Sequence, residues 1–169
     1  MGPTGMATRP EQLYEDDFYA WTREQARALR RLADKRWNGP LDLLHLAEEV
    51  EDLGSEQQWA VESRLERVIE HLLKLEHSPN PEPRRQWMIS VNNARGDIER
   101  RMAPTIRREI EPALAERYRH ARRNAELGLL DHKEQDAARA LPPSCPYAFD
   151  DLLADEWWPA NRHGLTDED

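Results

Sequence analysis

Apolar residues recur at intervals of three and four positions along almost the whole chain, and the breaks between these runs are rich in Pro and Gly. This spacing places the apolar side chains on one face of an α-helix. With only four Val and seven Gly, the chain also lacks the composition of a β-sandwich or a parallel-sheet domain. The pattern predicts an all-α fold, an antiparallel bundle of four to five main helices with a short C-terminal helix docked on it.

The breakers set the expected helix ends. Asn38-Gly39-Pro40 and the loop Pro79–Pro83 interrupt the helical pattern. Gly54 followed by Ser55 matches a C-terminal glycine and a new N-cap, so the second and third helices are expected to fold back on each other there. The expected helices are 16–35, 42–54, 55–77, 85–102, 104 to about 128 (kinked or divided at Pro112) and 147–154.

Composition is close to that of a disordered chain, since Leu, Ile, Val and Phe make up only 31 of 169 residues and the net charge is −9. Nearly all of these residues fall on the helical stripes, however. We therefore expect a single domain over 11–160 with flexible tails at 1–10 and 161–169. Residues expected in the core or at helix ends include Leu32, Leu43, Leu46, Ala47, Val50 and Leu53, and the tryptophans Trp21, Trp37, Trp59 and Trp87.

Charge is segregated along the sequence. Residues 84–123 contain 11 Arg and five acidic residues, a net charge of +6, which leaves −15 for the rest of the chain. Such a segment could bind nucleic-acid phosphates, and this is one alternative function. The acidic remainder offers internal partners, and aromatic residues are absent from the segment apart from Trp87 and Tyr118. Nucleic-acid binding is therefore not the favoured interpretation.

Two charged stripes suggest a polar cluster. Glu48, Glu51 and Asp52 share one stripe with Glu49 beside them, and a second stripe holds Arg64, Arg67, His71 and Lys74. A fold-back at Gly54 would let the stripes meet, either as a salt-bridge network or as two solvated faces. The sharper hypothesis is a cluster of Glu48, Glu49, Asp52, His71 and Lys74 in a metal-dependent or phosphate-acting enzyme. Its candidate ligands for an Mg, Mn or Fe-type ion are Glu48, Asp52 and His71.

Recognised catalytic motifs are missing. The sequence has no Glu-x-x-His pair, no Gly-rich phosphate loop, no HExxH and no G-x-S-x-G. The single cysteine, Cys145, excludes an intrachain disulfide and a Cys-based zinc site, and we interpret it as a small buried hydrophobe. No catalytic residue is assigned, and no cofactor is expected.

Location is predicted from the apolar runs. None is long enough to span a membrane, and the N-terminal residues do not form a basic region followed by an apolar stretch. These observations predict a cytoplasmic protein without a membrane partner.

Several motifs resemble those of one known family. They are the segments 14–26 (YEDDFYAWTREQA), 46–54 (LAEEVEDLG), 70–74 (EHLLK) and 145–147 (CPY), with the tail LLADE at 152–156. In this order they resemble the DUF29 family, a bacterial family of unknown function, over about 13–159. The resemblance implies an all-α bacterial domain with no established activity. Its motifs fall on Trp21, Glu48, Glu49, Asp52, Gly54, His71 and Lys74.

The leading hypothesis is a non-enzymatic helical domain that acts through protein contacts, either as a homo-oligomer or with another protein. It rests on the absence of catalytic motifs, on the segregated charge and on tryptophans that look exposed in the sequence pattern.

Overall fold

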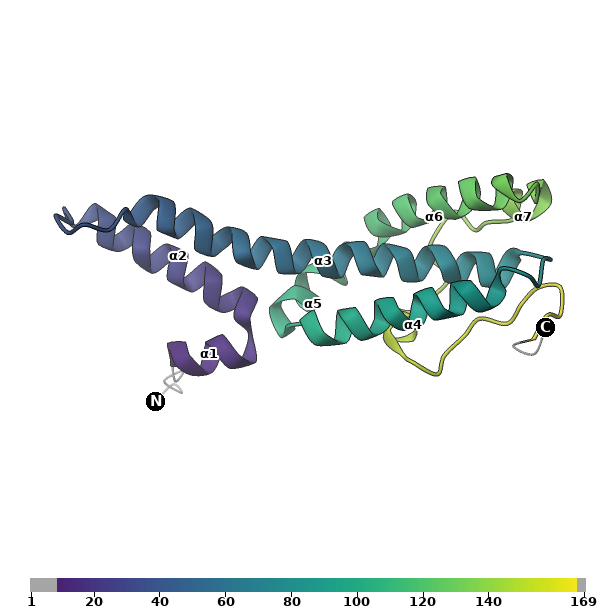
Figure 1. The fold of residues 1–169 in the computed structure, drawn as a ribbon, viewed down its shortest axis with the longest axis horizontal. Coiled ribbons are helices and arrows are strands. Elements are labelled where there is room, and N and C mark those ends of the chain that lie inside the picture. The colour runs from purple at the N-terminus through teal and green to yellow at the C-terminus, as the bar shows by residue number, and fades with distance from the viewer. Residues whose placement is uncertain (1–8, 167–169) are drawn as a thin grey trace, which may run out of the picture. The chain divides into compact units, whose positions relative to one another are not determined.

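The structure is a computed structural model that describes residues 9–166, and all regular secondary structure in that range is α-helical (Figure 1). The helices are α1 Pro10–Asp16, α2 Phe18–Asp34, α3 Leu43–His77, α4 Arg84–Arg101, α5 Pro104–Ile110, α6 Leu114–Asp131, α7 Gln135–Arg139 and α8 Phe149–Leu153. The all-α prediction is confirmed, and four helices, α2, α3, α4 and α6, have 17 residues or more.

The described part of the chain divides into two compact units. The single domain over 11–160 stays a prediction from the sequence. Within the described residues, unit 1 contains 9–59 together with 103–108, and unit 2 contains 60–102 and 109–166. Helix α3 contributes its first half to unit 1 and its second half to unit 2. Of the predicted tails, residues 1–8 and 167–169 lie outside the described residues, and Pro10 already begins α1.

Unit 1 is built on a hairpin of α2 and α3. The predicted breaker Asn38-Gly39-Pro40 lies in the connection, which leaves α2 through Arg36 with a left-handed φ of 58°. Arg30 Nη2 lies 2.6 Å from Glu51 Oε2, and the earlier Thr22 lies beside the later Gly54. The two helices are therefore antiparallel.

Gly54 does not end a helix, so the predicted break between 54 and 55 is wrong. Helix α3 runs through it without interruption. A Cβ at position 54 would lie 2.2 Å from Thr22 Oγ1 and 3.3 Å from the Tyr19 ring. Glycine costs about 1 kcal/mol relative to alanine inside a helix. Here the missing side chain allows α2 to approach α3 closely, and this packing contact explains why a glycine lies inside the helix.

Asp17 caps α2, which begins at Phe18, two residues after the predicted start. One carboxylate oxygen accepts a 2.9 Å bond from the amide of Ala20, and the other accepts a 2.8 Å bond from the amide of Thr105. The side chain is buried. Asp17 thus caps α2 and joins it to the start of α5 within unit 1.

Unit 2 has a continuous apolar core. The α3 residues predicted on the buried stripe from Val61 onward are buried, and so is Trp87. α6 carries four core positions, Tyr118, Ala121, Ala125 and Leu129. Pro104 opens α5, as the sequence predicted, and Pro112 separates α5 from α6, which is one of the two alternatives that the sequence left open. Helix α7 has no predicted counterpart.

The ordered C-terminal segment of unit 2 extends past residue 160, where the sequence predicted that the domain ends. The ring of Trp157 lies 5.5 Å from that of Tyr147, and the Arg95 guanidinium lies 5.0 Å from the Trp158 ring. Asn161, expected at the start of a frayed terminus, donates from Nδ2 to the carbonyl oxygens of Leu75 (2.7 Å) and Ser78 (2.9 Å). The reason is that the last turn of α3 leaves carbonyls without helical partners, and Asn161 satisfies them.

Candidate functional site

The acidic part of the predicted cluster lies on unit 1. Glu48, Glu49 and Asp52 are exposed on the first half of α3. The nearby Glu51 is the carboxylate that pairs with Arg30 of α2. These acidic residues therefore form a solvated helix surface.

His71 and Lys74 lie in unit 2, on the second half of α3, and both are buried. Lys74 Nζ lies 2.7 Å from Glu70 Oε1 and 5.2 Å from the centre of the Trp87 ring. The Lys74 side chain also packs beside Gly128 of α6, where a Cβ would be in ordinary contact at 3.5 Å from Nζ. Lys74 is thus held by one carboxylate and one aromatic face.

His71 is a buried neutral imidazole. Neither of its ring nitrogens has a hydrogen-bond partner within the described part of the chain. Burial, with the smaller effects of the Lys74 and Arg67 charges, lowers the pKa of His71 to about 4 against the opposing effect of Glu70. At neutral pH the ring carries no charge, because a protonated imidazole would be poorly solvated there.

The structure does not bring the predicted cluster together by the route that the sequence suggested. The hairpin at Gly54 is absent, and the basic stripe has other partners: Arg64 Nε lies 2.9 Å from Asp97 Oδ2 of α4. Across residues 9–166, no group of three or more His, Cys, Asp or Glu side chains is arranged to hold a metal ion. Glu48, Asp52 and His71 thus have no shared site in this part of the chain.

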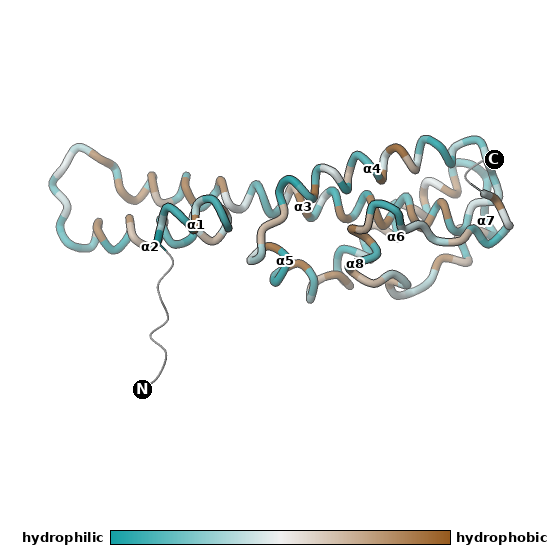
Figure 2. The backbone as a smooth tube through the Cα atoms, turned by 90° about the horizontal axis from the view of Figure 1, so that it is seen from below, coloured by the Kyte–Doolittle hydropathy of each residue, from teal (hydrophilic) through white to brown (hydrophobic). Residues whose placement is uncertain are grey.

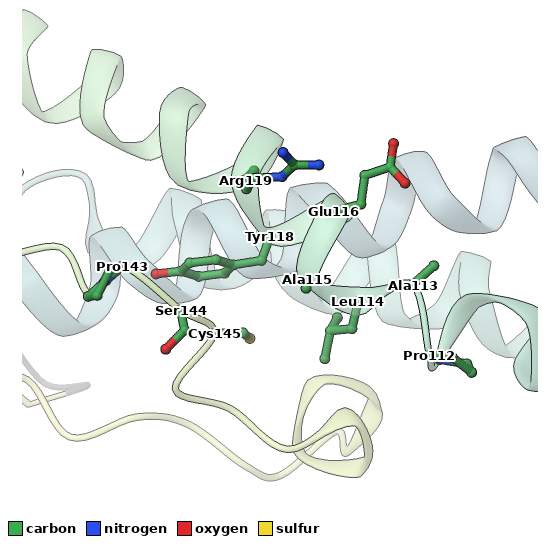
Figure 3. A pocket seen from close by; sticks show the side chains of 10 residues that line it. All are labelled: Pro112, Ala113, Leu114, Ala115, Glu116, Tyr118, Arg119, Pro143, Ser144 and Cys145. Atoms are coloured by element: carbon green, nitrogen blue, oxygen red, sulfur yellow. The ribbon is translucent and has the colours of Figure 1, made fainter.

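A pocket of about 690 Å³ lies in unit 2 between the start of α6 and the segment before α8 (Figure 3). Its wall includes Tyr118, Ser144 and Cys145, while Glu116 and Arg119 direct their charged ends away from Cys145. The half-buried Cys145 Sγ lies 3.6 Å from the Tyr147 carbonyl oxygen, and burial raises the pKa of the thiol. A raised pKa keeps the sulfur protonated and weakly nucleophilic at neutral pH.

The most distinctive surface lies on the α2–α3 hairpin of unit 1. Leu46 and Leu53, which the sequence predicted to be buried, are 40% and 51% exposed, and Leu32 is 40% exposed. Apolar residues recur along both helices, as the brown segments in Figure 2 show. Trp37 and Trp59, expected in the core or at helix ends, are also exposed.

These leucines lie on one side of the hairpin. On α3, Leu46 and Leu53 each precede a buried residue, Ala47 and Gly54. Leu32 likewise precedes the half-buried Ala33 on α2. A step of one residue back is the same rotation of about 100° on both helices. For antiparallel helices this rotation points to the same side of the pair.

We call this surface the hairpin face and define it by five residues, Ala28, Leu32, Leu46, Val50 and Leu53. Val50 is half-buried and the other four are exposed. Beyond it, Phe18 and Trp21 of α2 are partly covered by Tyr14 of α1, whose ring lies 4.8 Å from that of Trp21. The hairpin face is therefore the uncovered part of a longer apolar stripe.

A model of the domain of unknown function DUF29 matches residues 13–158 of the chain. The chain belongs to the DUF29 family. The resemblance inferred from the sequence motifs is thus confirmed, and the matched region contains the whole α2–α3 hairpin.

A solved structure has a fold similar to that of this DUF29 chain. It is an alpha-helical protein of unknown function from Rhodospirillum rubrum, 25% identical, with a TM-score of 0.73. The similarity covers 85% of the present chain and 90% of the other. No curated protein matches the chain. Among the described helices of this DUF29 chain, none is both long and apolar enough to cross a membrane.

Many arginines of the basic segment 84–123 have partners within this DUF29 chain. Arg95 is buried and donates to four backbone carbonyls, those of Asp151, Leu152, Asp155 and Trp157. Arg117 lies 3.1 Å from Glu66 and 3.6 Å from Glu62. Arg122 donates to the carbonyls of Leu141 and Pro142. These contacts hold three of the segment's 11 arginines inside unit 2.

Proposed function

We propose that this DUF29 chain acts through protein–protein contacts made by the hairpin face. The observation that carries the proposal is the exposure of Leu32, Leu46 and Leu53 on one side of the hairpin. Removing apolar surface from water stabilises by about 25 cal/mol per Å². A contiguous exposed apolar surface therefore favours a partner that covers it.

The shape of unit 1 supports this proposal. A pair of antiparallel helices buries only one stripe of each helix, and the second stripe needs another element. Here α1 covers the Phe18–Trp21 end and leaves the hairpin face open. Scattered single leucines would carry no such implication, whereas these five residues share one side of the hairpin.

Site-specific photo-crosslinking tests the proposal in cells that make the full chain. A photoreactive benzoylphenylalanine replaces Leu53 in one variant. In a control it replaces Leu127, which is 54% exposed on α6 of unit 2. We expect a covalent adduct with a protein from position 53 and none from position 127.

Adding Leu46→Glu to the position-53 variant should abolish the adduct, because a buried carboxylate would be costly in the covered face. Adducts of equal yield from both positions, or none from position 53, would overturn the proposal.

A further inference from the structure

We infer that the hairpin face is covered by a second copy of this chain, with α2 of each copy packed against α3 of the other. The inference rests on the proposed function and adds the identity of the partner. Four helices would then form a bundle in which every neighbouring pair is antiparallel.

Charge on the two helices of the hairpin is opposite. Helix α2 carries four Arg and two acidic residues, a net charge of +2. The unit 1 part of α3, residues 43–59, carries five acidic residues and no Lys or Arg, a net charge of −5. A partner that fits both helices must place an acidic helix against α2 and a basic helix against α3. A second copy of the chain can do this with its own α3 and α2.

Two-fold symmetry restricts how two copies can meet. An axis parallel to the helices places α2 of one copy against the partner subunit's α3, so that the basic helix faces the acidic one. A perpendicular axis in the contact plane places α2 on α2 and α3 on α3, where like charges repel. The opposite charges therefore favour the first arrangement.

Arg31 and Glu49 provide the specific contact. Arg31 borders Ala28 on the side of α2 away from α3, and Glu49 borders Leu46 on the side of α3 away from α2. Both side chains are exposed, and neither has an ion-pair partner within residues 9–166. Thr22 lies against Gly54, and from that contact Arg31 is nine residues along α2 and Glu49 is five residues back along α3. The two positions therefore differ by about 6 Å in height, a distance that a long Arg side chain can span. In the parallel-axis dimer Arg31 of one copy lies next to Glu49 of the partner subunit.

The available area suits a small dimer. Helix α2 has 17 residues, so the face is at most about 25 Å long, and two helices side by side are about 20 Å wide. The flat projected area of the face is thus about 500 Å² per copy, and the accessible surface is larger because side chains protrude from it. Standard interfaces bury about 800 Å² per partner, with weaker ones below about 600 Å². We therefore expect a dimer that dissociates measurably on dilution.

Sedimentation velocity of the purified full chain over a range of concentrations tests the inference, with helicity checked by circular dichroism. We expect the dimer dissociation constant to rise at least about tenfold in Leu53→Glu. The matched control Leu127→Glu, with nearly the same exposure on unit 2, should leave it within about twofold.

Charge reversal tests the pairing of α2 with the partner's α3. Arg31→Glu and Glu49→Arg should each weaken the dimer about threefold to tenfold, and the double variant should restore most of the affinity, because the pair is re-formed with exchanged signs. A wild-type chain that stays monomeric, or single reversals that are not rescued in the double variant, would overturn the inference.

The two proposals fail separately. A monomeric purified chain that still gives a position-53 adduct with a different protein in cells would overturn the second-copy inference and leave the proposed function standing. Absence of any adduct would overturn the proposed function itself.

Discussion

At the scale of single residues, two positions in α3 take their roles from tertiary contacts. Gly54 and His71 both belong to motifs that the sequence singled out, and neither role could be predicted from local pattern. Gly54 is placed by the approach of Thr22, 32 positions earlier in the chain. His71 was grouped with Glu48 and Asp52 because a fold-back was assumed, and the continuous α3 places them in different units.

Gly54→Ala should destabilise the protein, although the same change usually stabilises a helix. The new Cβ would lie 2.2 Å from Thr22 Oγ1, and we expect a loss of about 1–3 kcal/mol in unfolding free energy. Gly96→Ala in α4 is the matched control, because its Cβ would meet only Arg100 Nη1 at 3.6 Å. That variant should gain up to about 1 kcal/mol. Urea denaturation measures both, and changes of the same sign would contradict this role of Gly54.

His71 should make unfolding free energy depend on pH. The pKa of its ring is about 4 in the folded chain, against an ordinary value of 6.5. Between these values the unfolded chain binds a proton that the folded chain does not. Stability should therefore fall as the pH decreases from 6.5 to 4, with a slope of up to about 1.4 kcal/mol per pH unit from this residue.

Denaturant titrations at several pH values between 4.5 and 7 measure this slope. His71→Leu should reduce it, whereas His120→Gln, at an exposed position of α6, should leave it unchanged. An identical slope in wild type and His71→Leu would show that His71 does not carry the effect.

At the scale of elements, most helices could be predicted and their partners could not. The observed α4 and α5 follow the predicted 85–102 and the start at Pro104 closely, because Pro79–Pro83 and Pro104 act on the local backbone. The predicted helices 42–54 and 55–77 form one helix, α3. Gly54 and Ser55 match the residue preferences of a helix end, but the helix continues through them. The face that Leu46 and Leu53 present was predicted as core, because periodicity shows that a helix has an apolar side without showing how much of it is covered.

Arg95 should be essential for the position of the C-terminal segment. It donates to the carbonyls of Asp151, Leu152, Asp155 and Trp157 from a buried position in α4. Lysine has a single ammonium group and cannot reach four carbonyls in this geometry. We expect Arg95→Lys to lose at least about 2 kcal/mol of unfolding free energy and to increase amide exchange over 149–158.

The control for this substitution is Arg123→Lys, at an exposed position of α6. Equal amide exchange over 149–158 in both variants would refute the anchoring role of Arg95.

At the scale of the whole molecule, the charge segregation has two parts. Three of the 11 arginines of the basic segment 84–123, namely Arg95, Arg117 and Arg122, bind groups within unit 2. In unit 1 the basic α2 and acidic α3 pair through Arg30 and Glu51, and Arg31 and Glu49 are the charged residues that we propose to meet across the dimer. Membership of DUF29 carries no activity with it, so the hairpin face is the feature from which a function can be argued.

The molar mass of the unmodified full chain at sedimentation equilibrium tests the central claim most directly. The hairpin face predicts that the mass rises with concentration from the chain mass of 19.8 kDa toward twice that value. A mass that stays at 19.8 kDa over the whole range, with folded protein at every concentration, would contradict self-association through this face.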